Sequence, residues 1–353
     1  MGDDGVVPRL GNMKALLGLI AGAGASYGLY KLVRSGSKKS EISKRSIDRS
    51  SESGFESKPL SNMAIRPGSL LAKVSDMNII SGTETTRVTD TPPSDVLSKS
   101  PGSLEPRHIG MLLYLLQNTP NPSERRQVLL TLGNAAAFTV NQDLVRESGG
   151  LHVIAGFLPD PSPDVRVQTL NALNNLSMNV RNQEQLKIYV PQVLELIEMS
   201  PVNSEIQLAA LRLLTNLSVT DIHQHLMKNA TKLFLSLLVV SNEILQIQVL
   251  KVLVNLSSNP DMMDDIVQAQ APASLVLLFD CCTNTPVLLR LFTFIGNLRA
   301  WRPSAQVAEA LRRRSDSLYC VLLDESSQLH SRLPALLSHP DSEVKAQVAK
   351  LLT

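Results

Sequence analysis

Apolar residues recur along positions 104–353 at the spacing of amphipathic helices, and short polar breaks separate the runs. The segment RESGGLHVIAGFL predicts two short helices with a break at Gly149 and Gly150, and the PDPSP that follows predicts a turn. DVRVQTLNALNNLS then predicts a longer third helix that starts near Asp164, which is a good N-cap residue. The apolar side of this third helix is expected to hold Val165, Val167, Leu170, Leu173 and Leu176.

A short motif recurs near the end of each third helix: TLGNAAAF, ALNNLSMN, LLTNLSVT, VLVNLSSN and FIGNLRAW. Its asparagines, separated by 41, 41, 39 and 42 residues, are Asn134, Asn175, Asn216, Asn255 and Asn297. A period near 40 with one recurrent motif is typical of a helical solenoid. The final segment, HPDSEVKAQVAKLLT, predicts one more third helix in a truncated capping repeat. Residues 104–353 are therefore predicted to form an all-α solenoid of about five to six repeats.

A polar stripe accompanies the recurrent asparagines. Positions four and seven residues before each asparagine lie on the same side of a helix, so the stripes of stacked units form a ladder. In the central units this stripe carries Arg212, Lys251 and Arg290, which makes it modestly basic. Such a surface is expected to repel a basic segment and to attract an acidic one.

Composition fits a helical core and gives no sign of catalysis. Hydrophobic residues make up 43% of the chain but aromatic residues only 4%, so the core is expected to be mainly aliphatic. The net charge of +2 gives no reason to expect nucleic-acid binding. Cys281, Cys282 and Cys320 lack the spacing of a zinc site and cannot all pair with one another, which favours a reducing compartment. No phosphate loop, nucleophile elbow or metal-binding helix motif is present, so no cofactor, metal or enzymatic activity is expected.

The residues before the solenoid divide into a short tail at 1–14, an apolar run at 15–33 and a Ser-rich segment at 34–102. The Ser-rich segment has no apolar period and is predicted to be a disordered linker. The apolar run allows three interpretations: a cleaved signal peptide, a buried helix, or a transmembrane signal-anchor. Sixteen uncharged residues separate Lys14 from Lys31, and a helix extended to Val33 would span about 28 Å, close to the ~30 Å of a hydrocarbon core.

Two observations favour the anchor over a signal peptide. Asn175, Asn216 and Asn255 are glycosylation acceptors by sequence, and glycans on these third helices of a secreted protein would obstruct stacking. Four basic residues from Lys31 to Lys39 precede the first acid, which predicts that the solenoid faces the cytosol. A second helix could approach the anchor closely, giving helix–helix association, at four small residues: Gly18, Gly22, Gly24 and Gly28.

Three helices per unit and an L-x-N-L-S ending on the third resemble the armadillo repeat more than the two-helix HEAT repeat. The resemblance implies an armadillo-type right-handed solenoid, in which the asparagine ladder lines a concave groove and holds an extended peptide. A second interpretation stays open, in which each asparagine bonds the neighbouring helix and fixes the superhelix. The nuclear-import receptors of this family place Trp four residues before the asparagine, where this chain has none. The chain is therefore a poor candidate for a nuclear-import receptor.

The whole chain resembles the Alex (armadillo repeat-containing, X-linked) family of mitochondrial membrane-anchored armadillo proteins. The resemblance lies in the short apolar anchor with a basic flank and in the motifs TLGNAAAFTVNQ and LNALNNLSMNVRNQ. It implies a non-enzymatic adaptor of the mitochondrial outer membrane, with its armadillo domain in the cytosol. The expected role is in mitochondrial distribution, transport and dynamics, with the Miro and TRAK transport adaptors as partners. The residues leave open an alternative, a scaffold of the endoplasmic-reticulum membrane or the nucleus that binds an acidic transcription-factor segment and affects cell growth or survival.

Overall fold

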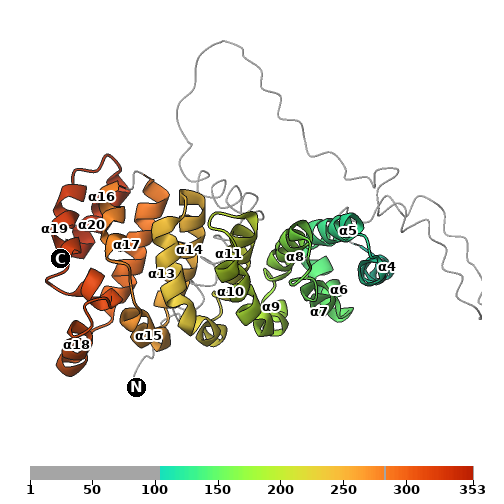
Figure 1. The fold of residues 1–353 in the computed structure, drawn as a ribbon, viewed down its shortest axis with the longest axis horizontal. Helices are drawn as coiled ribbons and strands as arrows, with labels where there is room; N and C mark the ends of the chain where they lie inside the picture. The colour runs from blue at the N-terminus through green and yellow to red at the C-terminus, as the bar shows by residue number, and fades with distance from the viewer. Residues whose placement is uncertain (1–103, 282–283, 353) are drawn as a thin grey trace, which may run out of the picture.

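The computed structural model describes residues 104–281 and 284–352 (Figure 1). Within these ranges the chain consists of helices and their connections, with one isolated antiparallel bridge between Gln270 and Ser317. None of the described helices is long and apolar enough to cross a membrane. The predicted tail, anchor and linker at 1–14, 15–33 and 34–102 lie outside the described residues and stay predictions.

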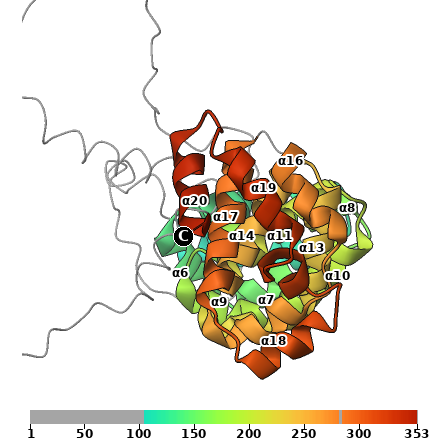
Figure 2. The ribbon, with the colours of Figure 1, turned by 90° about the vertical axis from the view of Figure 1, so that its left-hand side faces the viewer.

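Six helices, which we call the third helices, follow one another through the described part of the chain, and each packs against the next (Figures 1 and 2). The recurrent asparagine lies near the end of the first five. The all-helical solenoid predicted from the period is therefore confirmed. The third helices are α5 (Pro122–Ala135), α8 (Pro163–Leu176), α11 (Glu205–Leu217), α14 (Glu243–Ser257), α17 (Thr285–Ala300) and α20 (Ser342–Leu352).

The remaining helices precede the first third helix or connect one third helix to the next. They are α4 (Pro106–Asn118), α6 (Thr139–Glu147), α7 (Gly150–Ala155), α9 (Val180–Leu186), α10 (Val190–Met199), α12 (Asp221–Gln224), α13 (Thr231–Val240), α15 (Met263–Gln268), α16 (Leu278–Cys281), α18 (Ala305–Arg312) and α19 (Gln328–Leu336). Short 3₁₀ segments occur at η3 (Lys187–Tyr189), η4 (His225–Ala230), η5 (Pro260–Met262) and η6 (Ala273–Leu277), and η7 (Tyr319–Leu323) is a π-helical turn.

The second repeat has the three helices that its sequence predicts, with one correction at a cap. Gly149 lies between α6 and α7 with a left-handed φ of 68°, a conformation that glycine adopts without the steric cost of a side chain, and α7 begins at the next residue. The third helix, α8, has Ser162 rather than Asp164 as its N-cap. The prediction was wrong by two residues because Pro163 occupies the first helical position, where its fixed φ suits the start of a helix. Asp164 lies instead in the first turn, where a carboxylate is favourable beside the helix dipole.

The core runs continuously through the stack and is built mainly from Leu, Val, Ile and Ala, as the composition predicts. In α8, Val165, Leu170, Leu173 and Leu176 are fully buried and Val167 is half-buried. The first two third helices approach closely at Gly133, because a Cβ added there would lie 3.3 Å from the Cα of Ala172. A small residue at this contact lets the backbones of α5 and α8 come close enough for the polar contacts described below.

The C-terminal end of the described chain closes the stack. Helix α20 packs against α17, and the guanidinium of Arg299 on α17 donates to the carbonyl oxygen of Leu351. Nη2 of the same arginine lies 2.9 Å from Nε2 of His330 on α19. Helix α20 thus lies where the sequence predicts the third helix of a final capping repeat. Its buried residues, Val344, Val348 and Leu351, complete the apolar contacts of the last repeat.

Candidate partner-binding surface

The asparagine ladder (Asn134, Asn175, Asn216, Asn255 and Asn297) directs its amide nitrogens toward the preceding repeat. In four rungs Nδ2 donates a hydrogen bond to a backbone carbonyl of the third helix before it. In each case the acceptor is the residue immediately before the previous asparagine of the ladder. The bonds run from Asn175 to Gly133 (2.9 Å), from Asn216 to Asn174 (3.0 Å), from Asn255 to Thr215 (3.2 Å) and from Asn297 to Val254 (3.3 Å).

The serine of the L-x-N-L-S motif gives the next repeat a second acceptor. Nδ2 of Asn216 lies 3.0 Å from Oγ of Ser177, and Nδ2 of Asn255 lies 2.9 Å from Oγ of Ser218. Asn297 repeats the contact with Ser257 at 3.0 Å. The asparagine and the serine of one motif therefore serve two different interfaces, which accounts for their recurrence together.

The rungs of the ladder differ in their exposure to solvent. Asn134 is exposed, whereas Asn216 keeps only 3% of its surface and the other three are half-buried. The structure therefore assigns the amide nitrogens of Asn175, Asn216, Asn255 and Asn297 to stacking of the repeats. Peptide binding through the ladder stays a prediction.

A second row of amides joins the repeats and was missed in the sequence. The glutamines eight residues after three of the ladder asparagines are buried. Nε2 of Gln142 donates to the carbonyl of Asn175 at 3.1 Å, and Nε2 of Gln224 donates to that of Asn255 at 3.3 Å. The repeat alignment contains the signal, because the pairs NQ, NQ and HQ recur at 141, 182 and 223. His223 lies in α12 with 1% exposure, and its Nε2 is 2.9 Å from Oε1 of Glu184.

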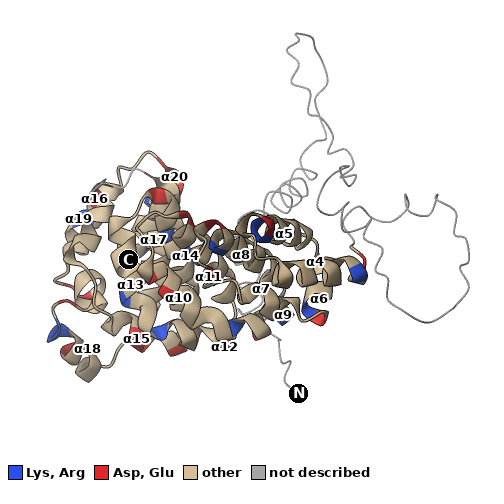
Figure 3. Cartoon of the chain, turned by 45° about the vertical axis from the view of Figure 1, so that its right-hand side comes forward, with Lys and Arg blue, Asp and Glu red and all other residues tan. Residues whose placement is uncertain are grey.

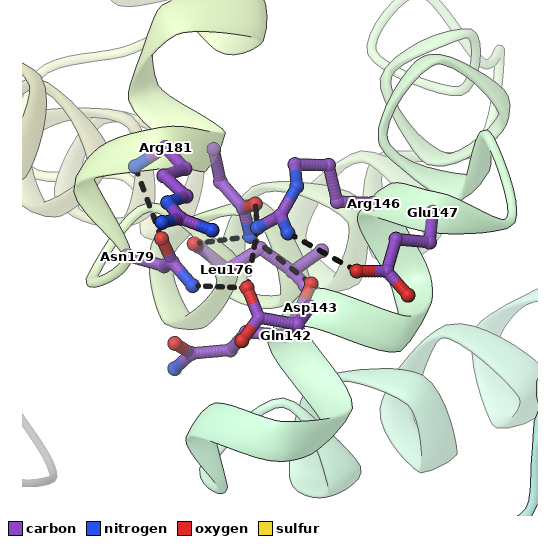
Figure 4. A network of polar contacts seen from close by, with 8 residues as sticks. Gln142, Asp143, Arg146, Glu147, Leu176, Asn179 and Arg181 are labelled. Carbon is purple, nitrogen blue, oxygen red and sulfur yellow. Dashed lines mark hydrogen bonds and ion pairs between the residues drawn. The ribbon is translucent and has the colours of Figure 1, made fainter.

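The start of this second row forms what we call the first-helix network, between α6 and α9 (Figure 4). Nη1 of Arg146 reaches both Oδ1 of Asp143 and, at 3.0 Å, Oδ1 of Asn182. Nδ2 of Asn179 donates to Oδ1 of Asp143 at 3.0 Å. The hydrogen bond from Arg146 lowers the pKa of Asp143 against the opposing effect of burial, with a further contribution from Asn179. In this network, hydrogen bonds join the charged groups of one repeat to the amide side chains of the next.

The cationic cluster is the second polar feature of the third helices, and it consists of Arg212, Lys251 and Arg290 on α11, α14 and α17. All three side chains are half-buried. Nη1 of Arg290 donates to the carbonyl of Pro286 in its own helix at 2.7 Å. Because α11 packs against α14 and α14 against α17, the three cations that the sequence places on the stripe lie close enough for both arginines to act on Lys251.

Burial and mutual repulsion raise the free energy of the charged cluster. The pKa of Lys251 is lowered from 10.5 to about 8 by burial first, and then by the positive charges of Arg290 and Arg212. Burial also lowers the pKa of Arg290. An anion held between these side chains would reverse both effects, because it replaces lost hydration and cancels the repulsion.

Two polar atoms, Nε of Arg212 in the cluster and Oε1 of Gln248 beside it, are buried without a hydrogen-bond partner among the described residues. Gln248 lies one turn before Lys251 on α14 and is 7% exposed. Buried polar atoms without partners are uncommon in folded proteins, since each costs roughly 1–3 kcal/mol. Elsewhere charged residues of both signs are scattered along the stack (Figure 3).

The described residues show no arrangement for metal binding, since no three His, Cys, Asp or Glu side chains are placed to hold an ion. Cys320 is a free thiol whose Sγ lies 3.3 Å from the carbonyl oxygen of Leu311. The side chains of Cys281 and Cys282 lie outside the described part of the chain.

Comparison with known protein families identifies the family to which this stack of helices belongs. The sequence profile of the family described as Armadillo-like matches residues 104–323. The chain belongs to the armadillo-like repeat family. Armadillo-like repeats thus account for every third helix from α5 to α17, and the fold is one that typically serves as a non-enzymatic protein-binding scaffold.

Solved structures of designed armadillo repeat proteins have the same fold as this armadillo-like chain. One, in complex with the peptide (KR)4, matches with a TM-score of 0.57 and 18% sequence identity, over 69% of this chain and 98% of that one. Computationally designed armadillo repeat proteins for modular peptide recognition match with a TM-score of 0.58 and 17% identity, over 69% and 98% of the two chains. At these identities the similarity concerns the fold alone.

Proposed function

We propose that this armadillo-like chain is a non-enzymatic adaptor of the Alex type, anchored in the mitochondrial outer membrane, whose solenoid binds protein partners in the cytosol. The observation that carries the proposal is the stack of armadillo-like repeats from α5 to α17, which presents polar side chains of successive third helices side by side. The likeness to proteins designed for modular peptide recognition supports a role in binding extended segments.

The location rests on the N-terminal sequence. The apolar run at 15–33 and the basic residues that follow it support an anchor with the solenoid in the cytosol. The environment of Asn216 supports a compartment without N-glycosylation. Its Nδ2 makes two bonds to Asn174 and one to Ser177, and a glycan on that nitrogen would break them.

Imaging of the full chain with a C-terminal fluorescent tag tests the location. The tagged chain is expected on mitochondria, and deletion of residues 1–34 is expected to release it into the cytosol or nucleus. Deletion of residues 40–102 is the matched control, because it shortens the chain but keeps the anchor and its basic flank. A solenoid that stays on mitochondria without residues 1–34 would contradict the anchor.

Proximity labelling from the C-terminus tests the partners. We propose that Miro and TRAK transport adaptors are among the labelled proteins, and that their labelling depends on residues 1–34. If the full chain on mitochondria labels neither adaptor, the transport role is wrong while the location can still hold.

Association through the anchor is a separate part of the proposal. Gly18, Gly22, Gly24 and Gly28 would let two helices approach in the membrane. Cross-linking of full chains in membranes is expected to yield a dimer that is lost in Gly22→Leu with Gly24→Leu. An undiminished dimer would place the association elsewhere.

The cationic cluster favours a second candidate function, a scaffold of the endoplasmic-reticulum membrane or nucleus that holds an acidic transcription-factor segment and thereby affects cell growth or survival. Arg212→Glu with Lys251→Glu would then release that factor in a co-precipitation experiment. Mitochondrial location of the full chain, with no transcription factor among the labelled proteins, would exclude this candidate.

A further inference from the structure

Stacking of the repeats does not explain why three cations gather on successive third helices. Arg212, Lys251 and Arg290 come from α11, α14 and α17, and neighbouring packed helices lie about 8–10 Å apart. The ladder asparagines on the same helices bond the preceding repeat, but no such bond to another repeat is made by Arg212 or Arg290 in the described structure. Burial of these two arginines therefore costs stability, and no contact between repeats in the described structure offsets it.

Three other half-buried arginines of the described chain pair with carboxylates, whereas Arg166 and Arg299 donate to backbone carbonyls. Arg125 meets Asp160 at 3.0 Å, Arg146 meets Asp143 at 2.5 Å, and Arg332 meets Asp280 at 2.7 Å. Neither Arg212 nor Arg290 has a carboxylate within 4.0 Å among the described residues. Their half-buried positions make this difference notable, because a desolvated cation without a counter-charge is costly.

A second observation is that two buried polar atoms lack a hydrogen-bond partner in the described structure, one on Arg212 of the cluster and one on Gln248 a turn before Lys251. Oε1 of Gln248 is a hydrogen-bond acceptor on a side chain that is more than nine-tenths buried, and Nε of Arg212 is a donor. Together with the cations they offer what an extended acidic peptide needs, namely donors for carboxylates and an acceptor for a backbone N–H.

We propose that Arg212, Lys251 and Arg290 bind an acidic segment of a protein partner, with its Asp or Glu carboxylates held between the three cations. The inference rests on the proposed function, since it names the chemistry of the partner that the solenoid binds. Two helix spacings are ~20 Å, and an extended chain advances ~3.3 Å per residue, so the segment contacts the cluster over about six residues. Charge complementarity selects an acidic partner, because carboxylates match the planar donors of arginine and stabilise the protonated form of Lys251.

Nucleic acid fits the surface less well than an acidic peptide. Single strands are held by aromatic side chains that stack on bases along a basic track. Besides the cations and the ladder asparagines, the stripe carries Ala209, Gln248 and Thr293, and none of its positions on α11, α14 or α17 is aromatic.

Fluorescence anisotropy with the full chain in detergent tests the proposal, using an N-acetylated hexaglutamate peptide with a C-terminal fluorophore at about 50 mM salt, where charge interactions are weakly screened. Hexaglutamine and hexalysine peptides are the controls for length and charge. The protein variants are Arg212→Gln, Lys251→Gln and Arg290→Gln, singly and together. Lys232→Gln is the matched control, because it removes the same charge from an exposed position on α13.

The wild-type chain is expected to bind hexaglutamate. Each single cluster variant is expected to lower the affinity about tenfold, and the triple variant is expected to abolish binding. The affinity of Lys232→Gln is expected to stay within twofold of the wild type. Affinity is also expected to fall as pH rises through 8 to 9.5, since Lys251 loses its proton, and this fall should vanish in Lys251→Gln. Thermal melts that match or exceed the wild type show that the variants fold.

Four results would overturn the proposal: hexaglutamate binding that survives in the triple variant, equal binding of hexalysine, tighter binding of a diphosphoserine peptide, or a thymidine hexanucleotide that binds instead of the peptide. Failure here is separable from failure of the proposed adaptor role. A chain that labels its partners on mitochondria but does not bind hexaglutamate keeps that role and loses only the acidic segment.

Discussion

Charged side chains contact opposite charges or amides in the first-helix network, whereas like charges lie together in the cationic cluster. Around Arg146, each charged group lies against an opposite charge or an amide of the next repeat. The cluster places Arg212, Lys251 and Arg290 together on neighbouring helices, and the two arginines shift the pKa of Lys251 downward. Arg146, with 12% of its side chain exposed, shows that this chain can bury most of an arginine against a counter-charge, here the more exposed Asp143.

This difference separates groups that hold the solenoid together from groups that are available to a partner. Two oppositely charged groups in contact recover part of the hydration free energy that each loses on burial. Removing one of them therefore destabilises the fold. A cluster of like charges is destabilised by burial and mutual repulsion, so removal of one of its charges is expected to leave the fold intact or more stable. The following substitutions measure that contrast, from the largest expected effect to the smallest.

The ladder itself gives the largest effect. Asn216→Ala is expected to lower the free energy of unfolding by about 2–3 kcal/mol, because the backbone carbonyl of Asn174 and the hydroxyl of Ser177 lose their buried donor. Asn134→Ala is the matched control at an exposed rung and is expected to change stability by less than about 0.5 kcal/mol. Urea denaturation followed by circular dichroism measures both. Equal losses in the two variants would contradict the stacking role of the buried amide.

Lys251→Met is expected to act in the other direction and raise the free energy of unfolding by about 1–2 kcal/mol, after allowance for partial exposure. The substitution keeps the length of the side chain while it removes the charge that burial and two arginines disfavour. The same urea titration measures it, with Lys232→Met on α13 as an exposed control. A destabilised Lys251→Met would mean that the cluster supports the fold rather than a partner.

Arg146→Met tests the matched network and is expected to lower stability by about 1 kcal/mol, since Asp143 and Asn182 both lose a donor. Arg126→Met provides the comparison, because Arg126 is exposed on α5. If Arg146→Met were neutral or stabilising, the contrast between the two regions would disappear.

The smallest effect is a dependence on pH. Lys251 has a pKa near 8 in the folded chain and an ordinary value of 10.5, so between these values the unfolded chain binds more protons and wild-type stability rises with pH. Below pH 8 the penalty is fully present. The stability gain of Lys251→Met is therefore expected to shrink by about 0.5–1 kcal/mol between pH 7.5 and 9.5. Denaturation midpoints at the two pH values measure it, and a gain that stays constant would exclude Lys251 as the titrating group.

Much of the fold could be predicted because its repeats are encoded locally. The spacing of the apolar residues and the recurrent motif place α8, α11, α14 and α17, and the Gly149–Gly150 break separates α6 from α7. The N-cap at Ser162 was missed, since the choice between two good caps depended on Pro163. The cationic cluster was also predictable, because positions four and seven residues before the ladder asparagines share one side of a helix.

The sequence by itself determined the period, the helical class and the residue types on the stripe, since these follow from patterns within one helix or one repeat. Only the tertiary structure decided what those residues do. The amides of Asn175 and Asn216 reach carbonyls 42 residues earlier in the chain, and those contacts depend on how closely consecutive third helices pack. Gly133 sets that distance for the first pair. The same packing matched Arg146 to Asp143 and Asn182 but left Arg212 beside Lys251, because side chains on neighbouring helices meet only after the repeats are stacked.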